Sequence, residues 1–368
     1  MLKVFLMQNI FIILLFTLSV AGCELFKNPS HSSETPPLIG QIETVTTLPF
    51  RPGNVAATKD GRVFATVHPF AGELGIQLLE VTSVGSYKPW PADKFQTKKG
   101  QYSENTIDTP LGITKDNQGG LWIVDMGLHL GKTRIWGFNI DSGELISKID
   151  LPIDMAPAES FVQDLVIDRE KGWVYLADLA NPGILAVELA TGNVRRFSHH
   201  PSLQPEPEAK MVINGKAIMF GSQPSNSGIN PITLSADGEM IYFGAMNGKS
   251  WYSVPANLFR TGASDDAISS KIARVGEKPV SDGATTDSSG NHFFTNLNQN
   301  GVDKLSANGT LTPLARDTRL DWPDNVSLDN NGWLYVAVNQ LHKSAPFTGS
   351  KDKGQAPYYI YRIWANSN

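Results

Sequence analysis

The chain has 368 residues, of which 41% are hydrophobic, with a formal net charge of -5 and a pI near 5.8. This acidic balance excludes a general affinity for nucleic acid, because phosphate binding needs a basic surface. Cys23 is the single cysteine, so no intramolecular disulfide can form. The fold must therefore be stabilised by its hydrophobic core, and a chain of this length has enough apolar surface to bury.

The N-terminal residues have the composition of an export signal. Lys3 precedes an apolar run from Val4 to Val20, and small residues follow. The string LSVAGC (18–23) is similar to a bacterial lipobox, in which the cysteine is acylated. The alternatives are an ordinary signal peptide with a cysteine nearby by chance, or an uncleaved anchor. We expect residues 1–22 to be the signal and a lipid on Cys23 to hold the protein on a membrane surface. The expected location is the bacterial cell envelope or the extracellular space.

The rest of the chain divides into a tether and one domain. Residues 23–37 are polar without a sustained period, as in a flexible tether. In residues 38–368 a hydrophobic strand runs six times into an Asp/Gly-rich turn and out into a second strand, which predicts a hairpin. The units recur every 40 to 70 residues or so, the range of propeller blades. We therefore predict an all-β, single-domain, six-bladed β-propeller. Its units are Pro52–His68, Pro110–Asp125, Val162–Asp178, Ile229–Met246, Ser281–Asn296 and Trp322–Asn339.

Polar residues lie at the strand ends of every unit. In a hairpin, the start of the first strand lies beside the end of the second. The first strand of a propeller blade is innermost, so these ends are expected to meet at one mouth of the central channel. The predicted pairs are Asn54 with His68, Gly112 with Asp125, Asp164 with Asp178, Asn230 with Met246 or Asn247, Asp282 with Asn296, and Asp324 with Asn339.

Such a ring has several chemical uses. Carboxylate and carboxamide oxygens are the ligands of a hard cation such as Ca²⁺. The ring also suits a ligand ammonium, or proton transfer where neighbouring carboxylates raise one another's pKa. The structural alternative is that these groups only satisfy strand ends and water, but six equivalent positions favour a site. No cofactor is certain, and Ca²⁺ or another divalent cation is the candidate.

A second series of aspartates falls in the turns of the units. An aspartate there caps the turn through hydrogen bonds to its own backbone, which is a structural role. We therefore keep this series apart from the predicted ring. Its members are Asp60, Asp116, Asp168, Asp237, Asp287 and Asp329.

Three long strings carry a family resemblance: NPITLSADGEMIYFGAMNGKSWYSVPANLFR (230–260), VGEKPVSDGATTDSSGNHFFTNLNQNGVDKL (275–305) and LDWPDNVSLDNNGWLYVAVNQLHK (320–343). The chain resembles the major royal jelly protein/Yellow family, and its lipobox makes it look like a bacterial branch. The resemblance implies a six-bladed propeller. Yellow members are linked to dopachrome conversion, insect salivary members bind biogenic amines, and royal jelly members are storage or signalling proteins. The amine-binding positions match Asp324 and Asn339, with Leu341 where an aromatic residue is expected.

A more distant resemblance is to the SMP-30/gluconolactonase propellers. In that family a Glu, an Asn and an Asp hold a divalent metal. The resemblance implies Asn230 and Asp282 as metal ligands, with the Asp282-Gly283 step as general base. The glutamate of the first blade is not evident, since its place is near Asn54.

Three functions are carried forward. The first is an exported propeller that binds a small polar or aromatic molecule at its channel mouth, with dopachrome tautomerase-like activity in which His68 and Asp282 are the bases. Asn230 and Asn339 would then donate hydrogen bonds. The second is a metal-dependent lactonase. The third is a binding or scaffold protein without turnover, and the fold alone cannot choose among them.

Overall fold

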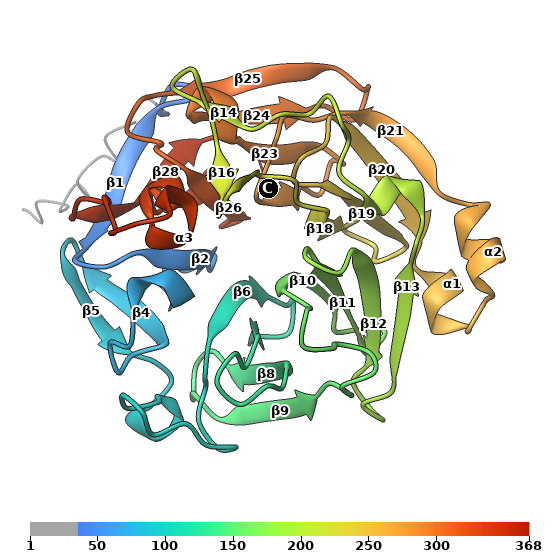
Figure 1. Cartoon of the computed structure of the whole chain (residues 1–368), viewed down its shortest axis with the longest axis horizontal. Coiled ribbons are helices and arrows are strands. Elements are labelled where there is room, and N and C mark those ends of the chain that lie inside the picture. The colour runs from blue at the N-terminus through green and yellow to red at the C-terminus, as the bar shows by residue number, and fades with distance from the viewer. Residues whose placement is uncertain (1–35, 368) are drawn as a thin grey trace, which may run out of the picture. The chain divides into compact units, whose positions relative to one another are not determined.

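A computed structural model describes residues 36–367, whose strands radiate from a central axis (Figure 1). They form six four-stranded antiparallel sheets, each one a blade of a β-propeller. The predicted fold class is thereby confirmed. The predicted signal peptide, Cys23 and the tether up to residue 35 lie outside the described residues. No helix of the described part is long and apolar enough to cross a membrane.

In blades 1 to 5 the strands follow chain order from the axis outward. Blade 1 has β2 (Pro52–Ala57), β3 (Val63–Val67), β4 (Leu78–Ser83) and β5 (Ser86–Pro89). Blade 2 has β6 (Pro110–Lys115), β7 (Gly120–Asp125), β8 (Arg134–Asn139) and β9 (Leu145–Asp150). Blade 3 has β10 (Val162–Asp168), β11 (Trp173–Asp178), β12 (Gly183–Glu188) and β13 (Val194–Ser198).

Blades 4 and 5 repeat this order, and blade 6 takes its outer strand from the start of the domain. Blade 4 has β18 (Ile229–Leu234), β19 (Met240–Ala245), β20 (Ser250–Pro255) and β21 (Ala273–Glu277). Blade 5 has β22 (Ala284–Thr286), β23 (His292–Asn296), β24 (Gly301–Leu305) and β25 (Leu311–Arg316). Blade 6 has β26 (Pro323–Leu328), β27 (Trp333–Val338), β28 (Tyr358–Trp364) and β1 (Ile42–Leu48).

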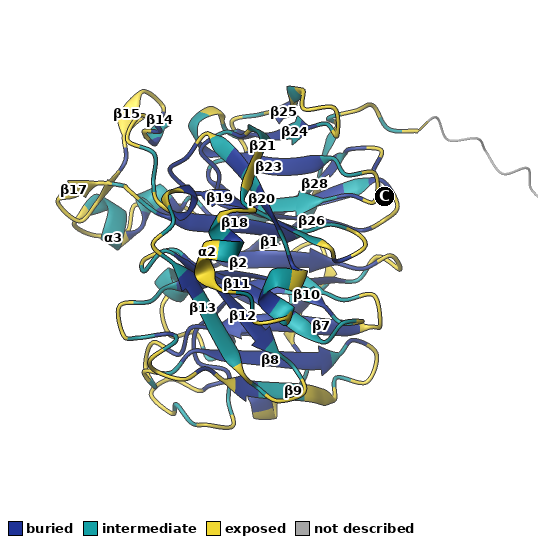
Figure 2. Ribbon diagram, turned by 90° about the vertical axis from the view of Figure 1, so that its right-hand side faces the viewer, coloured by how far each residue is buried: buried dark blue, intermediate teal, exposed yellow. Residues whose placement is uncertain are grey.

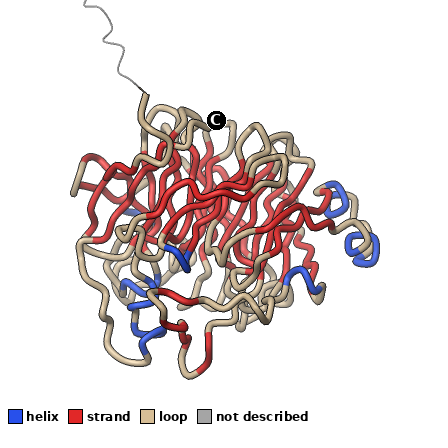
Figure 3. The backbone as a smooth tube through the Cα atoms, turned by 90° about the horizontal axis from the view of Figure 1, so that it is seen from above, coloured by secondary structure: helices blue, strands red, loops and turns tan. Residues whose placement is uncertain are grey.

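Two loops build a cap over one face of the propeller, the face where the inner strands begin. Figure 3 shows these short elements on one side of the strand layer. The loop between blades 3 and 4 carries β14 (Val212–Ile213), β15 (Lys216–Ala217), β16 (Met219–Phe220) and β17 (Gln223–Pro224). The loop after β27 carries the 3₁₀ turn η5 (Leu341–Lys343) and helix α3 (Ala345–Thr348). The other two α-helices, α1 (Asn257–Arg260) and α2 (Asp265–Ser269), lie in blade 4 between β20 and β21.

The core lies between neighbouring blades. The middle strands are buried on both faces because each blade packs against the next, as the dark interior of Figure 2 shows. The second strand of blade 2, with the sequence GLWIVD, is buried along its whole length, which explains its continuous run of apolar residues. Trp122 at its centre is fully buried and packs with Val174 and Leu176 of blade 3. A separate apolar cluster, with Met246, Trp322 and Leu341 among its members, lies beneath the cap.

The turn aspartates are confirmed as structural. The Asp116 carboxylate accepts from the Gly120 amide at 2.6 Å, and the Asp287 carboxylate accepts from the Asn291 amide at 2.8 Å. Asp168, Asp237 and Asp329 make equivalent bonds to amides two to four residues further on.

The ring closes by pairing the two ends of the domain. Strand β1 pairs antiparallel with β28, from Ile42 opposite Ile363 to Leu48 opposite Tyr358. Two segments from opposite ends of the domain thus supply strands to the same blade. Without this pairing, β1 and β28 would each present an open edge, which is a template for aggregation.

Deleting Tyr358–Asn368 is therefore expected to abolish cooperative folding. The deletion removes β28 from between β27 and β1, so that the last blade loses two of its four strands at once. Urea unfolding followed by circular dichroism should show a broad transition or none at all. A truncated protein with the parent's midpoint and slope would mean that the ring closes without β28.

Candidate functional site

The inner strands of five blades begin with a β-bulge. In blade 2, Pro110 pairs with Asp125, but the next pair is Ile113 with Ile123, so one residue is extra on the inner strand. The predicted pairing of Gly112 with Asp125 is therefore wrong, and Asp164 pairs with Ala177 and not with the predicted Asp178. Bulges bend a strand and re-aim its side chains, and they are frequent beside functional sites. The shifted stretches contain or adjoin Asn54, Asp164, Asn230 and Asp324.

Asp282 is the centre of the polar groups at the channel mouth. Its side chain accepts hydrogen bonds from three blades: from Gln163 Nε2 at 2.7 Å, from Trp322 Nε1 at 2.7 Å and from Asn230 Nδ2. Asn230 Nδ2 also contacts the Asp282 carbonyl oxygen at 2.7 Å. The residue is 2% exposed. The carboxylate of Asp282 is therefore buried although it lies at the channel mouth, because the neighbouring inner strands and Trp322 enclose it.

The backbone on both sides of this carboxylate is specialised. A Cβ on Gly283 would lie 2.5 Å from the Asn325 Cα, so only glycine allows the inner strands of blades 5 and 6 to approach so closely. Trp322 has a φ of 61°, a left-handed conformation that a bulky side chain rarely adopts. This conformation places the indole N–H against Asp282. Strain of this kind is concentrated at functional sites.

Three buried carboxyl groups share the centre of the propeller. Burial raises the pKa of Asp282 to about 7, although its three hydrogen-bond donors lower it. Burial, with the charge of Asp282, raises the pKa of Asp164 to about 8. Burial and the same charge raise the pKa of Asp324 well above its ordinary value. Asp282 and Asp164 therefore exchange protons near neutral pH, as a general acid or base must.

Above Asp282 lies a cavity of about 530 Å³ between the blades and the cap. The cap closes over it through Phe220 and Phe347, whose ring centroids are 5.1 Å apart, and through a 3.0 Å hydrogen bond from the Gly221 amide to the Pro346 carbonyl. The walls are mainly apolar, while the polar side chains include Gln163 and Asp282. The apolar lining includes Phe70, Phe161, Leu179, Pro182, Phe220, Met246, Trp322, Leu341 and Phe347.

His68 lies on the wall of the same cavity. Burial and the charge of Arg51 lower its pKa to about 3, so the ring is neutral under ordinary conditions. Its Nδ1 accepts a hydrogen bond from the Phe70 amide at 3.0 Å, which leaves the proton on Nε2. His68 is therefore better suited to donate a hydrogen bond than to act as the base that the sequence predicted.

Deeper in the channel, the predicted ring has unsatisfied acceptors. Asn339 Nδ2 donates to Asp324 Oδ2 at 2.5 Å. Four buried oxygens of this region have no hydrogen-bond partner among residues 36–367, and buried oxygens of this kind are normally satisfied by water or a ligand. They are Asn54 Oδ1, Asn230 Oδ1, Asp324 Oδ1 and Asn339 Oδ1.

The predicted residues at the ends of the second strands have another role. Asp125 accepts from the Thr109 amide at 2.8 Å and from Arg134 Nη2 at 2.7 Å, in an ion pair with both side chains fully buried. Asp178 is held in the same way by the Phe161 amide and Arg196. Asn296 accepts from the Gln299 amide and donates to Asp303.

These contacts brace loops and outer strands, and none of the three residues lines the cavity. The reason is geometric, because a second strand lies one strand further from the axis than the first. Its last side chain therefore faces the loop that precedes the inner strand. The predicted ring is thus divided: the inner-strand residues meet at the centre, and Asp125, Asp178 and Asn296 hold the loops. His68 and Asn339 also end second strands but remain at the channel.

The predicted metal ligands Asn230 and Asp282 do not fit a divalent cation in this arrangement. The Asp282 carboxylate oxygens face N–H donors from Gln163, Trp322 and Asn230, where a metal would need free lone pairs. The first-blade position holds Asn54 instead of a glutamate. Within residues 36–367 no group of three or more His, Cys, Asp or Glu side chains is placed to hold a metal ion.

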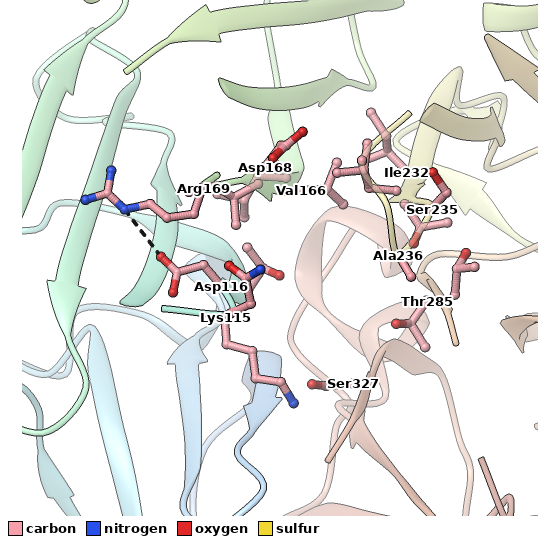
Figure 4. A pocket seen from close by; sticks show the side chains of 18 of the residues that line it. Lys115, Asp116, Val166, Asp168, Arg169, Ile232, Ser235, Ala236, Thr285 and Ser327 are labelled. Atoms are coloured by element: carbon pink, nitrogen blue, oxygen red, sulfur yellow. Dashed lines mark ion pairs between the residues drawn. The ribbon is translucent and has the colours of Figure 1, made fainter. Parts of the chain in front are cut away.

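The opposite mouth of the channel has a smaller cavity, of about 270 Å³, where the inner strands end (Figure 4). The Lys115 ammonium there donates to the carbonyls of Ala57 and Leu328, and so ties blade 2 to blades 1 and 6. Burial lowers the pKa of Lys115 to about 8. These bonds give Lys115 a clear structural role.

Sequence reasoning missed Gln163, Trp322 and the aromatic residues of the cap. Trp322 had a usable signal, because it opens the sixth unit directly before Pro323 and Asp324. Gln163 is next to the predicted Asp164. In a strand without a bulge, successive side chains point to opposite faces, so the pattern places Gln163 on the face away from Asp164. Phe220 and Phe347 lie in irregular loops, and no pattern in the sequence brings those loops together.

Fold and site together define the class of protein: a six-bladed propeller with a capped channel mouth whose floor is a buried carboxyl group. The family model described as major royal jelly protein matches residues 109–360. This is more than half of the chain, and the chain belongs to that family. No curated protein matches it.

Solved structures confirm the architecture. A gluconolactonase from Xanthomonas campestris is 11% identical with a TM-score of 0.54, over 89% of this chain and 90% of that one. A streptogramin B lyase is 14% identical with a TM-score of 0.51, over 89% and 98%. A virginiamycin B lyase from Staphylococcus aureus in complex with quinupristin is 14% identical with a TM-score of 0.51, over 88% and 98%. At these identities the likeness shows the fold alone.

The raised pKa of Asp164 predicts a pH-dependent stability difference. A carboxyl with a folded pKa of about 8 and an ordinary value of 3.8 binds more protons in the folded state between these values, so it destabilises the fold as pH rises. Asp164→Asn removes this loss of stability at high pH and keeps an oxygen that can accept the hydrogen bond from the Leu165 amide. From pH 5 to pH 8 the variant should gain about 3 to 4 kcal/mol in free energy of unfolding relative to the parent.

Urea unfolding at the two pH values measures this difference. Asp154→Asn, a substitution of an exposed aspartate, is the control and should show no such gain. An Asp164→Asn protein whose stability runs parallel to that of the parent would show that Asp164 is ionised throughout this range.

Proposed function

We propose that this protein binds a small aromatic molecule in its capped channel mouth and catalyses a proton transfer on it, as a dopachrome-type tautomerase does. The observation that carries the proposal is the single carboxyl group, Asp282, at the floor of an aromatic cavity of about 530 Å³. A cavity of this size and lining suits a ligand with one ring or a few rings.

The carboxyl group supports both binding and chemistry. An ammonium group on the ligand would stabilise the ionised form of Asp282 and lower its pKa. For a quinoid ligand, the carboxylate would take a proton from the carbon next to the carbonyl. The same proton, returned at another position of the ligand, completes an isomerisation without any co-reactant. A base whose pKa lies near 7 is well matched to such a step at neutral pH.

His68 is the complementary group. Its Nε2 carries the proton and it lies on the cavity wall, so it would donate a hydrogen bond to the oxygen that gains negative charge. Gln163, which is bonded to Asp282, would hold the carboxylate in position. Asn230 plays the same positioning part from blade 4, while Asn339 lies deeper, with Asp324.

The metal-dependent lactonase has less support, because the donor set at Asn230 and Asp282 does not suit a cation. Binding without turnover remains the second candidate. The largely apolar walls of the cavity favour it independently of any chemistry at Asp282.

Asp282→Asn should separate the two candidates. Dopamine is expected to raise the melting temperature of the parent, whereas 4-ethylcatechol, which lacks the amine, should raise it less. A ligand at 100 times its Kd adds about 2.7 kcal/mol of stability. The variant should lose the shift caused by dopamine and the turnover of dopachrome methyl ester. It should also be less stable by roughly 1 to 3 kcal/mol without ligand, because Trp322 then faces an amide.

Each ligand-induced shift is therefore measured against the same protein without ligand, and Asp154→Asn again serves as control. Turnover by the parent that persists in Asp282→Asn would remove Asp282 from the chemistry. If ligands raise the melting temperature of the parent but the parent does not turn them over, the result would favour a binding protein without catalysis. Hydrolysis of gluconolactone that depends on added Ca²⁺ would contradict both the tautomerase and the binding protein, and would favour the lactonase.

We further propose that the protein is exported and anchored by a lipid on Cys23. The support is the sequence of residues 1–23, a signal-like apolar run that ends in LSVAGC with the only cysteine of the chain. A lipid there would place the propeller at the surface of a bacterial membrane, with the folded domain in water.

Cys23→Ser tests the anchor. The substitution removes the only thiol and leaves every residue of the propeller unchanged, so the purified domain should unfold as the parent does. In cells fed with labelled palmitate, the parent should become labelled and partition into detergent, whereas the variant should do neither. Equal labelling of the two proteins would refute the lipid assignment.

A further inference from the structure

A histidine and an aspartate form a pair outside the channel mouth, in a side cavity between blades 1 and 2. Asp108 lies in the loop before β6, and His129 lies in the loop after β7. Because β6 and β7 are antiparallel, these two loops meet at one end of blade 2. The His129 Nδ1 lies 2.6 Å from the Asp108 Oδ1.

The contacts of Asp108 fix the direction of this hydrogen bond. Its side chain is completely buried, and its Oδ2 accepts from the amides of His129 and Leu130, each at 3.0 Å. Both amides donate to this side chain, and a carboxylate accepts hydrogen bonds but donates none. The Nδ1 of His129 must therefore donate to Oδ1, which makes Nε2 the nitrogen that can accept a proton.

The imidazole is also held in its plane. Tyr102 stacks on the His129 ring with the centroids 3.8 Å apart and 11° between the planes. The loop that carries His129 turns at Gly127, with a φ of 62°, where a Cβ would lie 1.8 Å from the Lys132 carbonyl oxygen. No other residue type fits there, so the position of His129 is built into the loop.

The free side of His129 lines a cavity of about 250 Å³. The side chain is 39% exposed, and Nε2 has no hydrogen-bond partner within the described range 36–367. Lys98 and Lys99 also line this cavity, and the acidic residues there are Glu73 and Asp108. His68 lines both this cavity and the channel mouth, but Asp282 lines only the latter.

We propose that the Asp108–His129 pair is a second acid–base site, which takes up a small molecule with an acidic O–H or C–H group. His129 Nε2 accepts the proton, and the imidazolium that results is stabilised by the buried Asp108 carboxylate. The ligand keeps the electron pair of the broken bond as an anion, close to the ammonium groups of Lys98 and Lys99. This site does not depend on the proposed chemistry at Asp282.

The test uses the full-length protein and 5-nitrobenzisoxazole, a probe for general bases that fits a cavity of this size. The base removes the proton on C3, the N–O bond breaks, and the electron pair moves to oxygen to give the coloured 2-cyano-4-nitrophenolate. The parent is expected to exceed the rate in buffer alone. His129→Asn should reduce this excess by at least about 10-fold, since a positioned general base contributes on the order of 10²-fold or more.

The substitution is chosen because the asparagine Nδ2 replaces the imidazole Nδ1, so the bond to Asp108 and the loop are retained while Nε2 is lost. His199→Asn makes the same change at an exposed histidine of blade 3's outer loop and should leave the rate unchanged. Asp108→Asn should also slow the reaction, because it removes the charge that stabilises the imidazolium.

Two results would overturn the proposal. One is a parent protein that does not exceed the rate in buffer. The other is a rate that His129→Asn retains and Asp282→Asn loses, which would place the reactive base at the channel mouth instead.

Discussion

The pairing of β1 with β28 is the constraint on which the rest of the structure depends. It joins the start of the domain to its end within one blade and so turns six separate hairpin units into a closed ring. Only in a closed ring do the inner strands of blades 3, 4, 5 and 6 approach one another from different directions. The contacts of Asp282 with Gln163, Asn230 and Trp322 are the local result, since each partner comes from another blade.

The closed ring also explains the electrostatics at its centre. Asp164, Asp282 and Asp324 come from three blades, and each alone would be an ordinary strand-end carboxylate. Burial raises the pKa of all three, and the charge of Asp282 adds to the effect at Asp164 and Asp324. The arrangement costs stability near neutral pH, which is the usual state of a site shaped for function more than for stability.

Much of the fold could be predicted from the sequence because its signals are local. Alternating apolar residues and Asp/Gly turns are contained within each hairpin, so the six blades and the capping role of aspartates such as Asp116 were predictable. Asp282 could be singled out because it opens its unit at the inner strand. The burial of Asp282 could not be predicted, because this burial depends on Gln163 and Trp322, which lie 119 and 40 residues away in the sequence.

The errors share one physical cause. Asp125 and Asp178 occupy strand ends just as Asp282 does, but which groups face them depends on the distance of their strand from the axis and on arginines of outer strands. The bulges likewise shift the register by one residue, which no spacing of apolar residues signals in advance. The pair of Asp108 and His129 went unnoticed because its members lie 21 residues apart in irregular loops.

The cap, finally, forms part of the cavity wall without being part of the blades. Its hairpins and short helix come from two loops that lie outside the blades, and they touch each other through Phe220 and Phe347. Substitutions or insertions in these loops alter the walls of the cavity while the blades, the ring closure and the carboxyl at the floor stay as they are. Exchange of these loops therefore changes the shape of the cavity while the buried carboxyl group at its floor keeps its contacts with the blades.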